Sequence, residues 1–147
     1  MRNKLAYLWA SPWTALGLLF GLLFGALAWL GGATLRRVDG TLEIAGGALA
    51  RLATRALARA PFVAITFGHV ILGIDHATLA RLRRHEHAHV RQYERWGPLF
   101  VPLYLGSSLW HGLRGGAPYR DNAFEREARA AEHRPPAQRR ARAARRR

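Results

Sequence analysis

His85, Glu86 and His89 form an H-E-x-x-H motif within residues 76–97, HATLARLRRHEHAHVRQYERWG. The segment is predicted to be one helix. Four residues along a helix return to nearly the same face, so the two imidazoles can bind one metal ion with the Glu86 carboxylate beside it. His87 falls on the opposite face and is interpreted as incidental. The alternative is a polar, histidine-rich helix face that binds no metal.

A catalytic zinc site has three protein ligands and one open position for water. Because the chain contains no cysteine, the third ligand must be His, Asp or Glu. We predict Glu125, on a later helix that a return of the chain could bring opposite His85 and His89. Asn122 and Glu125 also match a capping box, in which the carboxylate caps its own helix instead. Glu127 points to another side and is the weaker candidate.

An H-E-x-x-H motif followed by a Glu on a later helix resembles the gluzincin class of zincin metallopeptidases, which have a thermolysin-like architecture. The strings HEHAHVRQYERWGP and YRDNAFEREA also resemble a group of short bacterial membrane-associated proteins. This resemblance covers about residues 62–133. It implies that zinc is bound by His85, His89 and Glu125, with Glu86 as the general base.

One position departs from the gluzincin pattern. Gluzincins often place an Asp four residues after the ligand Glu to orient a ligand histidine, but Arg129 stands there, and Asp121 is the candidate substitute. The resemblance also implies that residues 62–74 form an edge strand that aligns a bound peptide. The candidates for an oxyanion-stabilising side chain are Tyr93, Tyr104, His111 and Tyr119.

The 147 residues suffice for one domain, and the formal net charge is +14. Half of that charge comes from seven arginines within residues 134–147. Such a block is predicted to be a disordered tail, either a solubilising end or one attracted to anionic lipid or nucleic acid. Lipid is favoured because the other end of the chain is apolar. Nucleic acid is disfavoured because the basic run has no interleaved aromatic residues.

Residues 14–33 run for twenty positions without a charge, which as a helix spans about 30 Å, the hydrocarbon thickness of a bilayer. Trp13 and Trp29 lie where interfacial aromatic residues occur in membrane helices. The segment is therefore predicted to be one transmembrane helix. A signal peptide cleaved after Ala28 and a buried core helix are the alternatives.

Gly17, Gly21 and Gly25 are spaced four residues apart within this segment. Such spacing makes a flat groove through which two helices approach closely, so it predicts a homodimer. The orientation of the span is left open, because the basic residues on its two sides nearly balance.

The remaining segments predict an α+β fold. They are a β-hairpin over 34–46 with an Asp39-Gly40 turn, a helix over 48–60, a strand over 62–74 interrupted at Gly68 and His69, the helix over 76–97 begun by Asp75 and ended at Gly97, a core or interfacial segment over 98–112, and a last helix from Asn122. The predicted domains are 1–33, the N-terminal segment and membrane anchor; 34–133, a zincin-like domain with a short antiparallel sheet and a metal-binding helix pair; and 134–147, the tail.

Together these features predict a membrane-anchored, Zn²⁺-dependent metallohydrolase, specifically a peptidase acting on peptide or protein substrates. Zinc lowers the pKa of its water to about 7, and Glu86 can accept the proton as that water attacks a carbonyl. The alternative is a non-catalytic zinc-binding membrane protein, which the small size of the chain favours and the presence of Glu86 disfavours. The Arg-, Ala- and Leu-rich composition suggests a bacterium, so the predicted location is a bacterial cell membrane, as a single-pass protein.

Overall fold

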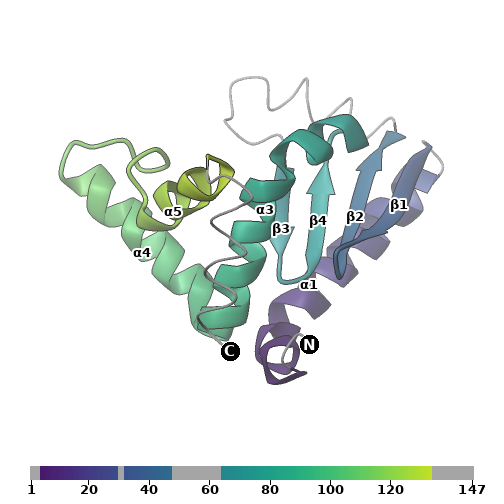
Figure 1. Ribbon diagram of the computed structural model, residues 1–147, viewed down its shortest axis with the longest axis horizontal. Coiled ribbons are helices and arrows are strands. Elements are labelled where there is room, and N and C mark those ends of the chain that lie inside the picture. The colour runs from purple at the N-terminus through teal and green to yellow at the C-terminus, as the bar shows by residue number, and fades with distance from the viewer. Residues whose placement is uncertain (1–3, 30–31, 48–63, 134–147) are drawn as a thin grey trace.

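The computed structural model describes residues 4–29, 32–47 and 64–133, with residues 20–29 described only as backbone (Figure 1). Its elements are α1 (Lys4–Trp29), β1 (Ala33–Val38), β2 (Thr41–Gly46), β3 (Ala64–Phe67), β4 (Val70–Gly73), α3 (His76–Trp96), the 3-10 helix η1 (Gly97–Leu99), α4 (Phe100–Leu113) and α5 (Ala123–Glu132). The α+β class is confirmed, with a small four-stranded sheet. The helix predicted over 48–60 and the tail over 134–147 lie outside the described residues.

The sheet has the strand order β1-β2-β4-β3. The predicted hairpin of β1 and β2 is confirmed, and its turn residues Asp39 and Gly40 both have positive φ, as a tight hairpin turn requires. The prediction of one strand over 62–74 is wrong, because β3 and β4 form a second antiparallel hairpin whose turn contains Gly68 at φ +56°. Since β2 pairs with β4 in parallel, the sheet is mixed rather than antiparallel as predicted.

Helix α3 covers one face of the sheet, and its predicted caps are confirmed. Asp75 accepts a hydrogen bond of 2.7 Å from the Thr78 backbone N–H, and Gly97 ends the helix. A buried apolar cluster joins α3 to the sheet and consists of Ala45, Ile71, Leu79 and Val90. On the same face, the Arg83 guanidinium donates to both carboxylate oxygens of the buried Glu43. The helix that carries the H-E-x-x-H motif is thus fixed against the sheet along its length.

The first half of α1 packs against the rest of the domain, under the turn between β3 and β4 (Figure 1). Thr14 accepts a hydrogen bond of 3.2 Å from the His69 backbone N–H, and the Tyr7 ring stacks on the His69 ring with centroids 4.1 Å apart. The approach is so close that a Cβ added at Gly17 would lie 2.6 Å from the Phe67 Cβ. The first half of α1 therefore covers the turn of the β3–β4 hairpin.

Among the described residues, no helix combines the length and the apolar character needed to cross a bilayer. The prediction of an N-terminal transmembrane helix is therefore wrong, and so is the single-pass location in a bacterial cell membrane that depended on it. The physical reason lies in α1, where Thr14 and Gly17 of the predicted span contact the β3–β4 hairpin of the same chain. Gly17 faces Phe67 and Val70 of the same chain, whereas the homodimer predicted for Gly17, Gly21 and Gly25 stays a prediction.

Helices α4 and α5 form a pair that lies beside α3 (Figure 1). Asn122 is the N-cap of α5, accepting a hydrogen bond of 2.9 Å from the Phe124 backbone N–H. The Asn122 amide also donates to the Tyr104 carbonyl and to the Ser108 hydroxyl, which ties the start of α5 to α4. The return of the chain therefore places α5 alongside α3, with Glu125 turned toward the motif.

Candidate metal centre

His85, His89 and Glu125 converge between α3 and α5, and one ligand atom from each lies within 4.8 Å of the others. The two Nε2 atoms are 3.1 Å apart. Each Nε2 is 3.3 Å from a different oxygen of the Glu125 carboxylate. All three side chains are buried. The structure thus brings together the three residues that the sequence suggested, by one-turn spacing on α3 and by the return of α5.

Gln92 determines which nitrogen of His89 carries a proton. Its amide Nε2 donates 3.0 Å hydrogen bonds to the Phe124 carbonyl and to the Glu127 carboxylate, which only accept. Its Oε1 is therefore the atom that lies 2.8 Å from His89 Nδ1, and it accepts a proton from that nitrogen. His89 consequently presents the lone pair of Nε2 toward Glu125 and His85.

Glu132 does the same for His85 from the end of α5. Its Oε1 lies 2.8 Å from His85 Nδ1, and a carboxylate accepts, so Nδ1 bears the proton. The Nε2 lone pair of His85 then points at His89 and Glu125. A partner that fixes the outer nitrogen of a ligand histidine is a regular feature of metal sites.

Two imidazole lone pairs and two carboxylate oxygens thus face one another across little more than 3 Å. Such a group of acceptors requires a cation or an extra proton at its centre. Burial lowers the pKa of His85, but the Glu125 contact and the charges of Glu86, Glu125 and Glu132 outweigh burial and raise it above 6.5. The Glu125 Oε2 atom is buried and has no hydrogen-bond partner within the described part of the chain. A His₂Glu donor set of this kind fits zinc.

The Glu125 carboxylate faces the two histidines and does not cap its own helix, so the capping-box alternative is not observed. Its Oε1 accepts a hydrogen bond of 2.8 Å from the Tyr104 hydroxyl, and Arg129 lies 3.8 Å from Oε2. Burial raises the pKa of Glu125, yet its contacts with His85, His89 and Tyr104 outweigh burial and hold the pKa well below 4.5. The carboxylate is therefore ionised at neutral pH, as a metal ligand must be.

Glu86 is buried at the junction of α3 with the sheet. Its Oε2 accepts a hydrogen bond of 2.6 Å from the Thr66 hydroxyl on β3, and the Tyr93 hydroxyl in turn donates to the Thr66 carbonyl. The negative charge of Glu86 also raises the pKa of His85, Tyr104 and Tyr119, so the carboxylate lies close to the ligand group without belonging to it.

Tyr104 and Tyr119 are the two phenols nearest the centre. Burial raises the pKa of each, and the charge of Glu125 raises it further, so both keep their protons at neutral pH. The Tyr93 hydroxyl donates a hydrogen bond to the Thr66 carbonyl on β3, and burial alone raises the pKa of Tyr93. The fourth oxyanion candidate, His111, lies at the end of α4, where its carbonyl accepts from the Gly116 N–H.

The remaining candidates have other contacts. Asp121 accepts from the Ala117 N–H and does not orient a ligand histidine, a role that Glu132 and Gln92 take here. Glu127 lies outside the ligand group, as expected, but its carboxylate accepts a hydrogen bond from the Gln92 amide. His87 lies on the other side of α3, where its ring nitrogen is 3.4 Å from the Thr41 hydroxyl.

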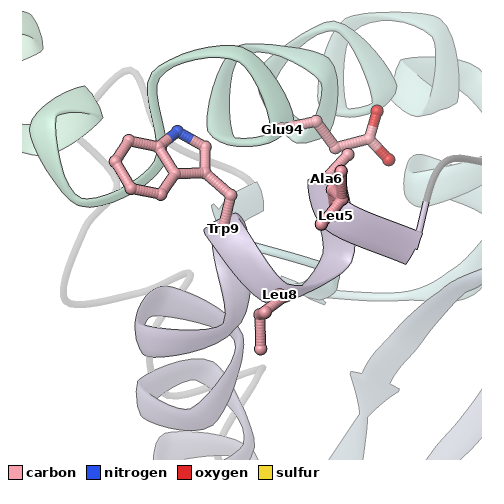
Figure 2. A pocket seen from close by; sticks show the side chains of 5 residues that line it. All are labelled: Leu5, Ala6, Leu8, Trp9 and Glu94. Atoms are coloured by element: carbon pink, nitrogen blue, oxygen red, sulfur yellow. The ribbon is translucent and has the colours of Figure 1, made fainter.

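A shallow hollow of about 460 Å³ lies away from this centre, at the start of α1 (Figure 2). Its lining is apolar except for Glu94 and consists of Leu5, Ala6, Leu8, Trp9 and Glu94. Glu94 is 3.1 Å from His69 Nε2, and it belongs to a different face of α3 from the two ligand histidines. The hollow is therefore separate from the metal ligands.

Comparison of the chain with known protein families, with curated proteins and with solved structures finds no match.

Proposed function

We propose that this protein is a zinc-dependent hydrolase that cleaves peptide bonds. The observation that carries the proposal is the convergence of the two Nε2 lone pairs of His85 and His89 on the Glu125 carboxylate. A second buried carboxylate, Glu86, follows His85 directly in the chain, and its charge acts on His85. A site that only stores or senses zinc needs the three ligands. A hydrolase needs, in addition, a base within reach of the attacking water.

Zinc held by this group would lower the pKa of a bound water to about 7 and polarise a substrate carbonyl. The residues of the chain supply the rest. Gln92 and Glu132 keep both histidines in the ligating tautomer, and Glu86 accepts the proton that the attacking water loses. Because the Thr66 hydroxyl donates to Glu86, that carboxylate is held in one orientation.

A peptide substrate is supported by the position of β3. The strand lies at the edge of the sheet, and among the described strands it pairs only with β4. Thr66, at its centre, bonds directly to Glu86. An extended peptide added along β3 would therefore pass beside the proposed base, with its backbone held by strand pairing.

The test is the substitution Glu86→Gln in the full-length protein. Glutamine keeps the size of the side chain and can still accept from Thr66, but it cannot take up the water proton. We expect zinc content to be unchanged and cleavage of a peptide mixture, followed by mass spectrometry, to fall by about 10²–10⁴-fold. Glu94→Gln is the matched control, because it makes the same change on another face of α3.

Burial of all three ligands and of Glu86 favours a second candidate, a non-catalytic zinc-binding protein. In that case wild type and Glu86→Gln bind zinc equally, and neither produces cleavage products from the mixture. That outcome would refute the hydrolase and leave the metal centre intact.

A further inference from the structure

We propose that the outer face of α4 is a docking surface for an anionic lipid bilayer, on which the protein rests without crossing it. Helix α4 has fourteen residues and no Asp, Glu, Lys or Arg among them. Its inner side is occupied by Phe100 and Tyr104, which pack against Phe124 of α5. The side turned away from α5 is apolar and exposed.

The outer face is continuous along the whole helix. The stripe starts at Leu99, the last residue of η1, and continues on α4 at alternating spacings of four and three residues through Leu103, Gly106, Trp110 and Leu113. The four large side chains in this stripe are exposed, and two further exposed leucines flank it, Leu105 and Leu109. Monomeric proteins rarely leave so extended an apolar face in water, so the face indicates a partner.

Charge around the face identifies the kind of partner. From Arg95 to Arg120 the chain contains no acidic residue. One Arg–Trp pair lies at the end of α3, before α4 begins: the Arg95 guanidinium is 5.2 Å from the Trp96 ring centroid. A second lies at the end of α4, where the Arg114 guanidinium is 3.9 Å from the Trp110 ring centroid. An apolar helix face bordered by tryptophan and arginine suits a bilayer surface, where leucines enter the acyl region and guanidinium groups meet phosphate.

A second copy of this chain is the competing occupant. Two copies that each carry a net charge of +14 repel one another, whereas the same charge attracts anionic lipid. The charge therefore favours lipid. The surface is also distinct from the metal ligands: Tyr104 connects α4 to Glu125 from the inner side of the helix, not the outer one.

The experiment is sedimentation of the full-length protein with vesicles of phosphatidylcholine and phosphatidylglycerol in a ratio of about 3:1. Leu109→Asp places a charge in the face, and Leu35→Asp is the matched control, because Leu35 is 59% exposed on β1 and Leu109 is 63% exposed. We expect Leu109→Asp to weaken vesicle binding about tenfold or more, and Leu35→Asp to leave it unchanged. Arg114→Ala should weaken binding to these vesicles but not to vesicles of phosphatidylcholine alone.

Two results would overturn the proposal. If Leu109→Asp and Leu35→Asp bind vesicles as wild type does, the apolar face does not bind lipid, and binding comes from basic residues elsewhere. If Leu109→Asp converts a dimer into a monomer, measured by light scattering, without changing vesicle binding, the occupant is a second copy. Circular dichroism and zinc content, both expected to match wild type, show that each variant is folded and that the metal centre is not what changed.

Discussion

The substitution Gln92→Leu tests how the chain prepares His89 for a metal ion. Gln92 is 2% exposed, and its Oε1 is the acceptor 2.8 Å from His89 Nδ1. Leucine has no acceptor for the Nδ1 proton, and the position is too buried for water to take the place of Oε1. Zinc binding then requires either an unpaired, buried Nδ1–H or a less favourable ring orientation, and an unpaired buried donor costs about 1–3 kcal/mol. Zinc affinity should therefore fall about 10–100-fold.

Glu132 provides the comparison for Gln92, because it holds the other ligand histidine from a more exposed position. Its side chain is 31% exposed, so in Glu132→Gln the new amide oxygen or water can still accept from His85 Nδ1. We expect a loss of less than about tenfold in zinc affinity, smaller than for Gln92→Leu because the site is wetter. Glu127→Gln is the control. It alters a partner of Gln92 while the Phe124 carbonyl still holds the amide, so affinity should change little.

The assay is zinc titration in competition with a chromophoric chelator, with circular dichroism to show that each variant is folded. Two results would refute the reasoning about tautomers. One is an affinity for Gln92→Leu equal to that of wild type. The other is a larger loss in Glu132→Gln than in Gln92→Leu, because burial would then not determine the cost.

Three further predictions concern the third ligand, the glycines of α1 and α4, and the effect of pH on zinc affinity. Glu125→Ala should abolish zinc binding, whereas Asn122→Ala should retain zinc in the same titration. Asn122→Ala should lower the free energy of unfolding by more than the roughly 1 kcal/mol of a lost cap, because the buried amide also donates to Tyr104 and Ser108. Gly17→Val should destabilise the protein by about 1–3 kcal/mol in chemical denaturation because Phe67 leaves no room, while Gly106→Ala, in an open helical position, should stabilise it by up to about 1 kcal/mol. Because the pKa of His85 is raised above 6.5 in the metal-free protein, protons compete with zinc, so affinity measured by titration should fall as the pH is lowered from about 8 to about 6.

Local chemistry made part of this fold predictable. Asp75 caps the start of α3, Gly97 caps its end, and Asp39-Gly40 forms the turn of the first hairpin. These features were predictable because each depends on only a few neighbouring residues. The second hairpin was not predicted. Its strands have four residues each, and its turn at Gly68-His69 is an unusual pair, so the apolar segment resembled one longer strand.

The long-range partners of a segment were the harder part. An uncharged run of twenty residues has the composition of a membrane span. At its start, Thr14 and Gly17 contact the β3–β4 hairpin, and hydrophobicity alone does not distinguish lipid from a protein interior. Composition likewise gave no sign that the start of α1 would pack at the β3–β4 turn.

The ligand group was predicted more fully than the residues that support it. His85 and His89 follow from helical spacing, and Glu125 from its place on a later helix. Gln92 and Glu132 were missed, although a signal for each was present. Gln92 follows His89 by three residues on α3, and Glu132 follows Glu125 by seven on α5, spacings that place each pair on one helix face.

The most direct test of the metal centre is the zinc content of the full-length protein after equilibration with zinc and removal of excess ion. His87→Ala is the decisive control, because His87 lies within the motif, between Glu86 and His89, but contacts Thr41 on the other side of α3. Wild type and His87→Ala should each hold about one zinc per chain, while His85→Ala and His89→Ala should hold only traces. Equal zinc in all four proteins, or a loss in His87→Ala as large as in His89→Ala, would contradict the assignment of the centre.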